Sequence, residues 1–401
     1  MIGILKRLKT LLDNPENLIY IAFVSVFLHY VITAAVIISL GIFLVSDEKR
    51  RKQCFSHSGK LLFVVFTCFT MLVALYHKNF IGAACSVGFY FIIVIGNYTR
   101  SVITEKIFDR CLNICCYVAI PLFLSALVEK VLNSQVPGYT CKLWFFNQNY
   151  FCAILATIVL ICGYNATSHK GPVLRYYICA SFAVAAMYLG KSIFAFIEVF
   201  IGLFILLILK RKHLMISVLL FAVVSCLVIV AAVPDIFPRL SEINITTERR
   251  IRIWNEAMPF IKENPFFGRG FLSYYQLAGQ NPDIYQTTHT HNFALEFLIS
   301  FGVIGTVILV LFLWSYYRKV AECKELLRNN NAATIILTIS SAVLLHMTTD
   351  MTLLWIQTGF LYALILGGIG VDEKALNKRI LACAHLGGRS DIKREKSPEK
   401  E

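Results

Sequence analysis

Charged residues are scarce in this sequence. They make up 15% of its 401 residues, whereas soluble domains carry about 25%. Apolar runs of about 17 or more residues recur along most of the chain, which is the pattern of transmembrane helices. Because most of these runs have no polar face, the sequence excludes a large soluble helical domain. A helical run also satisfies its own backbone hydrogen bonds in lipid.

The sequence also predicts no disulfide framework, no cleavable signal peptide and no internal repeat. The 13 cysteines fall mostly inside apolar runs, so we interpret them as small buried side chains and not as disulfides. The first apolar stretch is too long for a signal peptide and has no small-residue cleavage site. Without two inverted halves, the chain does not resemble a typical secondary transporter.

The apolar runs predict ten spans, at residues 61–76, 80–96, 111–128, 151–164, 175–189, 192–209, 214–233, 293–317, 332–347 and 352–371. Residues 18–46 precede them, as one tilted helix or as two short ones. Basic residues on both flanks favour two helices in a hairpin. We therefore predict an all-α membrane protein of about twelve transmembrane helices.

Basic residues predict the orientation of this bundle. The net charge is +14, and 28 of the 38 lysines and arginines fall on segments assigned to the cytoplasm. This bias explains the charge without a nucleic-acid partner. It predicts a transmembrane bundle at residues 1–232, an outward-facing catalytic loop with amphipathic helices at 233–290, and further transmembrane helices at 291–371. The cytoplasmic tail at 372–401 is expected to be solvated or disordered, with at most a short helix at residues 376–386.

The outward loop carries arginines against this trend. Arg250 and Trp254 are four residues apart on a predicted helix and share a face. Arginine binds phosphate through paired hydrogen bonds, so Arg249, Arg250, Arg252 and Arg269 predict recognition of phosphate or diphosphate. Lipid headgroups are the alternative partner. The apolar stripe of this helix is predicted to consist of Ile251, Trp254, Met258 and Ile261.

Two histidines close the loop, in the run Thr288-His289-Thr290-His291-Asn292. His291 lies just before a predicted span, where the helix dipole disfavours a protonated imidazole and suits a neutral base. A His-x-His pair can bind zinc, but no third ligand is evident nearby, so we expect no metal. Glu296, one turn into the span, either orients a partner or reaches the interface.

Further polar residues lie in and beside the spans. Gly190-Lys191-Ser192 resembles the end of a nucleotide-binding loop, but Ala185 replaces the upstream glycine and no strand precedes it. We interpret Lys191 as an outward cation near the same mouth as Arg250. Glu198 is an intramembrane acid that is either functional or paired with a buried Lys or His. Weaker candidates of the same kind are His29, His346 and Asp350.

Four short motifs in a fixed order resemble the O-antigen ligase and O-antigen polymerase superfamily: Arg250-x-x-x-Trp254, Asn264-Pro265-x-x-Gly268-x-Gly270, His291-Asn292 and Gly302-x-x-Gly305. The resemblance implies an inverting glycosyltransferase in a bacterial cytoplasmic membrane, with its catalytic loop outside. Its donor would be a glycan on a polyprenyl diphosphate. Its acceptor would be a sugar hydroxyl on a lipid or a second glycan. It implies no metal and no other cofactor.

The resemblance also implies roles for the candidate residues. Arg250 and Lys191 would hold the diphosphate and stabilise it as it leaves, although the family usually has arginine at the position of Lys191. His291 would take the acceptor proton. The remaining predicted substrate-binding residues are Arg249, Arg252, Arg269, Trp254, Asn292 and Glu296. A transporter or flippase of lipid-linked glycan is the alternative, and the sequence does not separate ligase from polymerase.

Overall fold

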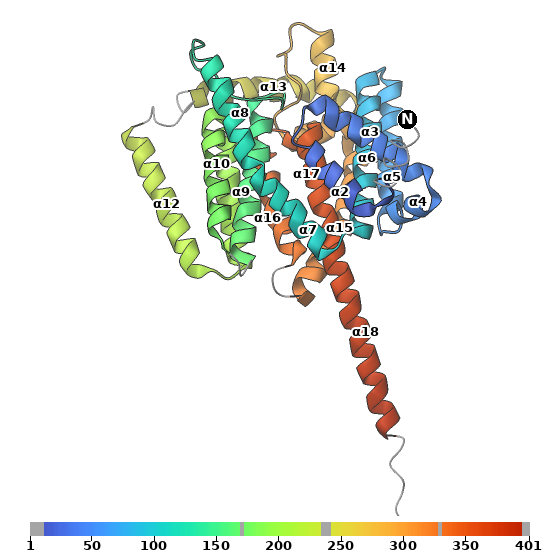
Figure 1. Ribbon diagram of the computed structural model, residues 1–401. Coiled ribbons are helices and arrows are strands. Elements are labelled where there is room, and N and C mark those ends of the chain that lie inside the picture. The colour runs from blue at the N-terminus through green and yellow to red at the C-terminus, as the bar shows by residue number, and fades with distance from the viewer. Residues whose placement is uncertain (1–11, 169–171, 234–241, 328–330, 395–401) are drawn as a thin grey trace, which may run out of the picture.

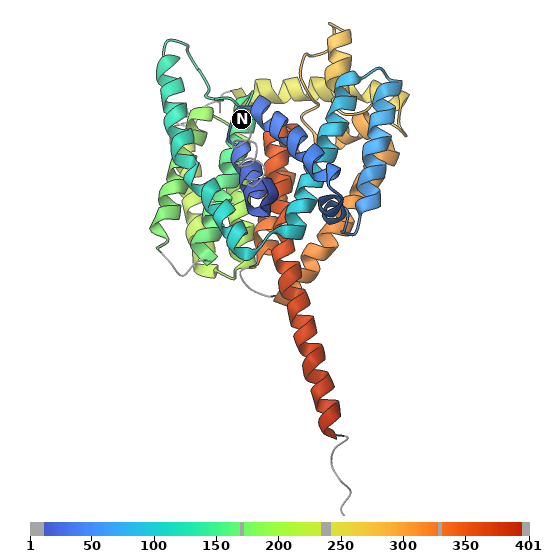
Figure 2. The same ribbon diagram turned by 45° about the vertical axis from the view of Figure 1, so that its right-hand side comes forward.

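A computed structural model describes residues 12–168, 172–233, 242–327 and 331–394, and within these ranges the chain forms helices and no strand. Figures 1 and 2 show a bundle of upright helices. In both views α14 lies at one end of the bundle, and α18 projects from the other. Residues 1–11 of the predicted N-terminal bundle and residues 234–241 of the predicted loop lie outside the described ranges.

The first apolar stretch forms two helices, α2 (Pro15–Ser25) and α3 (Tyr30–Ser46), as the flanking charges favoured. The side chain of Asn14 accepts a hydrogen bond at the start of α2, and that of His29 does the same at the start of α3. α4 (Glu48–Cys54) follows at an angle of 110° to α3. The second helix, α3, therefore begins at a capping residue of its own, His29.

Each of the ten predicted spans contains helix. These helices are α5 (Lys60–Tyr76), α6 (Phe80–Val102), α7 (Glu105–Tyr117) with α8 (Ala119–Leu132), α9 (Gln148–Ser168), α10 (Leu174–Gly190), α11 (Ile193–Leu209), α12 (His213–Ala232), α15 (Phe293–Leu327), α16 (Ala332–His346) and α17 (Ile356–Gly367). Among the described residues, five helices are long and apolar enough to cross a membrane, taking α7 with α8 as one, or six if α3 and α4 count as one span. Four more apolar helices are shorter. The number twelve stays a prediction.

The most enclosed helix is α9, in which every residue from 150 to 162 is buried. Helices α10, α11 and α16 pack against it. By contrast, none of the side chains described in α12 is buried, and Figure 1 shows α12 standing beside the bundle. Polar side chains at the start of α9, and at the ends of α11 and α16 that face it, are therefore held by closely packed helices.

Two helices occupy the predicted outward loop, α13 (Ile243–Glu263) and α14 (Ser273–Gln280). Figure 1 shows α13 lying across the end of the bundle. Its buried residues are Ile253, Ala257 and Ile261, four residues apart, and they pack with α14 and α15. The predicted stripe was right for Ile261 but wrong for Ile251 and Met258, which are exposed. The face covered by α14 and α15 lies to one side of the predicted one.

A break in α15 locks the loop onto the bundle. Gly302 has a positive φ of 60° inside this helix, and a Cβ there would overlap the backbone of Phe266. The nitrogens of Val303 and Ile304 donate to the carbonyls of Pro265 and Phe266 at 2.9 and 3.0 Å. The glycines and proline of the family motifs therefore position the loop.

Residues 372–394 of the predicted tail are helical in the structure, and residues 395–401 lie outside the described ranges. α18 (Ile369–Arg394) is one helix that runs beyond both ends of the short helix expected at residues 376–386. Its first turns are anchored in the bundle. Asp372 accepts hydrogen bonds from the nitrogens of Ala332 and Ala333, and Glu373 forms a 2.5 Å ion pair with Arg100. These buried contacts favour helix formation where composition indicated a free tail.

Candidate functional site

The segment that carries the two histidines is fixed from both sides. Trp254 on α13 donates its Nε1–H to the carbonyl of Thr290 at 3.0 Å. Glu296 on α15 accepts the Thr290 N–H at 2.9 Å and is fully buried, so it holds this turn and does not reach the interface. Both side chains were predicted to bind substrate. Here they position the residue that lies between His289 and His291.

Asn292 begins α15. Its Oδ1 accepts the backbone N–H groups of Ala294 and Leu295 at 3.0 and 3.2 Å, which is the usual work of a helix-capping residue. The residue before it, His291, has a left-handed backbone with a φ of 54°. The cap and the unusual backbone together set the direction of the His291 side chain. Asn292 therefore has a structural role at the start of α15, and its contact with substrate stays a prediction.

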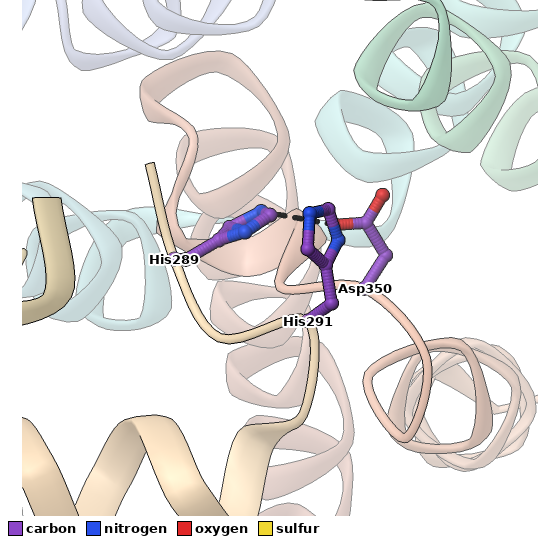
Figure 3. A group of neighbouring side chains, drawn as sticks. All are labelled: His289, His291 and Asp350. Atoms are coloured by element: carbon purple, nitrogen blue, oxygen red, sulfur yellow. Dashed lines mark ion pairs between the residues drawn. The ribbon is translucent and has the colours of Figure 1, made fainter. Parts of the chain in front are cut away.

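His289, His291 and Asp350 form a cluster (Figure 3). The Nε2 of His289 lies 2.9 Å from Asp350 Oδ1, and the Nδ1 of His291 lies 3.2 Å from the same oxygen. Asn149 donates its Nδ2–H to the other oxygen at 2.5 Å. The carboxylate is therefore held between the two histidines and the first turn of α9.

Access distinguishes the two histidines. The side chains of His289 and Asp350 are 2% and 1% exposed, whereas that of His291 is 22% exposed. Burial, together with the neighbouring His291, lowers the pKa of His289 to about 3 despite the attraction of Asp350. Although burial opposes its ionisation, the two histidines hold the pKa of Asp350 below its usual range. At neutral pH the cluster therefore contains a carboxylate and a neutral, buried His289.

The two predicted diphosphate cations lie near one end of α11. The guanidinium of Arg250 is 4.7 Å from the ring centre of Phe194, which is in the first turn of α11. Lys191 lies two residues before this helix, at the end of α10, and has a left-handed backbone. Its Nζ is 3.5 Å from the carbonyl oxygen of Gly138. Trp254, one turn along α13 from Arg250, touches the histidine segment, so Arg250 lies about 6 Å along the helix from that contact.

The other arginines have neighbours within the loop. Arg252 pairs with Glu256 at 2.7 Å, and Arg269 pairs with Glu263 at 2.6 Å. Arg249 is exposed on α13. The contacts of Arg252 and Arg269 stabilise the loop itself.

A second buried pair lies deeper in the bundle. Glu198 on α11 and His346 at the end of α16 approach to 2.6 Å, and each side chain is 1% exposed. The alternative in which Glu198 pairs with a buried histidine is therefore confirmed. The backbone N–H of Asp350 donates to the carbonyl of His346 at 3.0 Å, so the two histidine–carboxylate pairs share one chain segment.

Sequence reasoning missed most of the histidine cluster. It ranked Asp350 as a weaker candidate and did not consider Asn149, which donates a hydrogen bond to Asp350. Asp350 is far from the histidines in the chain, and only the packing of α16 beside α15 and α9 brings them together. One signal was present: Asp350 is an acidic residue between two predicted spans.

The cluster also supplies the third possible metal ligand that the sequence did not reveal. One ligand atom from each of His289, His291 and Asp350 lies within 4.8 Å of the others. Two imidazoles and a carboxylate form a ligand set that zinc accepts. One nitrogen of each histidine ring already lies near Asp350, at 2.9 Å for His289 and 3.2 Å for His291. The same geometry therefore also suits a carboxylate that orients a catalytic base.

Comparison with known proteins identifies one matching family. Residues 176–310 match the family described as O-antigen ligase, and this stretch includes Lys191, Arg250 and His291. A search of curated proteins found no match. The apolar helices and this match together indicate a multi-pass membrane protein. The match confirms that residues 176–310 resemble the O-antigen ligase and polymerase superfamily.

Proposed function

We propose that this protein is an inverting glycosyltransferase that moves a glycan from a polyprenyl diphosphate to an acceptor sugar hydroxyl at the outer face of a bacterial cytoplasmic membrane. The observation that carries the proposal is the contact between His291 and Asp350 within reach of solvent. The O-antigen ligase match supports this class and does not favour a transporter or flippase. The acceptor sugar is carried by a lipid in a ligase and by a second lipid-linked glycan in a polymerase.

His291 is the base in this proposal. Its Nδ1 lies 3.2 Å from the carboxylate of Asp350, whose negative charge favours a proton on Nδ1 and leaves Nε2 able to accept one. Nε2 lies 3.3 Å from the hydroxyl of Thr287, which shows that an alcohol oxygen fits there. Asp350 fixes the ring and stabilises the imidazolium that forms, as in other carboxylate–histidine pairs. His289 is too buried to meet an acceptor, and it supports the carboxylate.

The transfer is a single displacement. The acceptor oxygen forms a bond to the anomeric carbon as its proton moves to Nε2 of His291. The bond from that carbon to the diphosphate oxygen breaks on the opposite face, and its electron pair leaves with the diphosphate. Negative charge therefore grows on the leaving group. Arg250 and Lys191 stabilise this charge, which lowers the barrier beyond what substrate binding alone provides.

A cavity in the bundle suits the polyprenyl chain. It has a volume of about 280 Å³ and is lined mainly by apolar side chains of α6, α15 and α17. Met351 and Trp355 lie in its wall, and Met351 directly follows Asp350. Apolar pockets with a few polar groups at one end are typical ligand sites. A lipid tail held here would bring its diphosphate toward the histidine cluster.

Transfer by the purified protein tests this function. The donor is a polyprenyl diphosphate bearing the host glycan, and the acceptor is host lipid-linked glycan or lipid core. We expect a new glycosidic bond of inverted configuration, seen by nuclear magnetic resonance, with release of polyprenyl diphosphate. Movement of the donor across vesicles without a new bond would instead identify a flippase.

A further inference from the structure

Aromatic rings from three distant segments meet at one end of the bundle. Trp355, just before α17, stacks between Phe146 and Tyr150, with ring centres 4.9 and 5.1 Å apart. Tyr30, at the start of α3, lies 5.3 Å from Trp355 in a tilted arrangement. We refer to these four residues as the aromatic stack. It joins the start of α3, the segment before α9 and the start of α17.

The inner end of the stack touches the histidine cluster. The hydroxyl of Tyr150 lies 3.3 Å from Nε2 of His289, and the two rings are nearly perpendicular. Asn149, the preceding residue, donates to Asp350. The stack therefore leads directly from the proposed reacting groups to the surface.

The outer end is Phe146, whose side chain is 49% exposed. Its backbone has a φ of 68°, a conformation that bulky residues rarely adopt. An exposed ring in such a conformation is held outward at a cost in backbone energy, which indicates a function. The next three residues, Asn147, Gln148 and Asn149, all carry amides that can both donate and accept hydrogen bonds.

This combination has the chemistry of a sugar-binding site. The C–H groups on one face of a pyranose are weakly positive and pack against the negative face of an aromatic ring. Its hydroxyls form hydrogen bonds with amides. Tyr and Trp also occur in interfacial belts that contact lipid headgroups. The contact between Tyr150 and His289 favours a saccharide as the ligand of this stack. An aromatic belt that only contacts lipid headgroups would need no contact with a catalytic cluster.

We propose that the exposed face of Phe146, supported by Trp355 and Tyr150, binds a sugar ring of the glycan next to the bond that is made. The proposal rests on the proposed glycan transfer and adds where the saccharide is held. Phe146 and its amide neighbours would then select for the presented sugar face, while His291 and Arg250 act on the reacting atoms.

Saccharide binding tests the subsite independently of transfer. The probe is the oligosaccharide released by mild acid from the host's polyprenyl-diphosphate glycans, which carries neither lipid nor diphosphate. Its affinity for the full-length protein is measured by calorimetry. We expect Phe146→Ala and Phe146→Leu to weaken binding about three- to tenfold, and Phe146→Tyr to restore it. Phe80→Ala removes another exposed phenylalanine, at the start of α6, and serves as the matched control with unchanged affinity.

The outcomes separate the two proposals. His291→Ala should bind the oligosaccharide like the wild type while losing transfer. Saccharide binding that depends on Phe146 in a protein without transfer activity would support the subsite and refute the enzyme. Transfer activity with equal affinities in Phe146→Ala and Phe80→Ala would refute the subsite alone. Wild-type affinity in Phe146→Leu would also overturn it, because leucine keeps apolar bulk and removes the ring face.

Discussion

Two of the histidine–carboxylate pairs among the described residues, Glu198–His346 and Asp350–His291, differ mainly in access. Glu198 and His346 are both sealed in the bundle, with side chains 1% exposed. In the other pair Asp350 is equally buried, but His291 is 22% exposed. A buried pair stabilises or specifies packing, whereas a base must meet its substrate. The comparison therefore assigns a structural role to the Glu198–His346 pair and proton transfer to the Asp350–His291 pair. The two pairs differ in role although one chain segment carries both His346 and Asp350.

The largest expected effect is the loss of the accessible base. His291→Ala should lower the rate of transfer by about 10²–10⁴-fold, because a positioned base contributes that factor. Donor binding and the melting temperature should change little, since His291 is partly exposed. Single-turnover transfer with labelled donor measures the rate. A rate within about threefold of the wild type would show that another group takes the proton.

Arg250 is expected to have the next largest effect. Arg250→Ala should reduce transfer by about 10²–10³-fold, as for the loss of one group that stabilises transition-state charge. Arg250→Lys should rescue it poorly, because a point charge lacks the planar fork of a guanidinium. The matched change Lys191→Arg should be tolerated, since the superfamily usually has arginine there. Full activity of Arg250→Ala at normal expression would refute the diphosphate role.

Asp350 should follow as a positioning residue. Asp350→Asn keeps the size of the side chain but removes the charge that orients the His291 ring and stabilises its protonated form. We expect the transfer rate to fall about 10²-fold and its pH dependence to change, with little effect on donor affinity. An unchanged pH profile together with a lower melting temperature would indicate a structural role only.

The sealed pair should affect stability more than catalysis. Glu198→Ala leaves the Nδ1 of His346 without its partner, which costs about 1–3 kcal/mol for a buried polar group. The melting temperature should fall, while folded protein keeps transfer within about threefold of the wild type. Glu198→Gln retains a hydrogen-bond acceptor and is the matched control. Loss of transfer with an unchanged melting temperature would make Glu198 a functional acid.

The effect that is smallest at neutral pH concerns His289 and appears only as the pH falls. The folded pKa of His289 is about 3, below the value of about 6.5 expected for an unfolded histidine, so the unfolded state binds more protons between these values. Its contribution to stability is therefore present above pH 6.5 and is lost as pH falls toward 3, by at most about 1.4 kcal/mol per pH unit. His289→Asn should flatten this part of the pH dependence of the melting temperature. An identical dependence in both proteins would contradict the assignment.

Hydropathy predicted where the helices lie, because a span must satisfy its backbone in lipid whatever surrounds it. The His291-Asn292 motif also singled out the histidine that is the more exposed of the two. Hydropathy could not show that Gly302 breaks α15 to receive the Pro265–Phe266 backbone, since this depends on contact between two segments. Asp350 was underestimated for the same reason. The motif could not show that Asn292 caps α15, because a motif does not say whether its residues cap a helix or bind substrate.

The central claim is that His291 acts as a base and not as a metal ligand. The most direct test compares transfer by the purified wild type, His291→Ala and His289→Ala, each with and without EDTA. The account predicts that EDTA has no effect and that His291→Ala loses far more activity than His289→Ala. Equal losses in both variants, with inhibition of the wild type by EDTA and recovery on adding zinc, would contradict it and assign a metal to His289, His291 and Asp350.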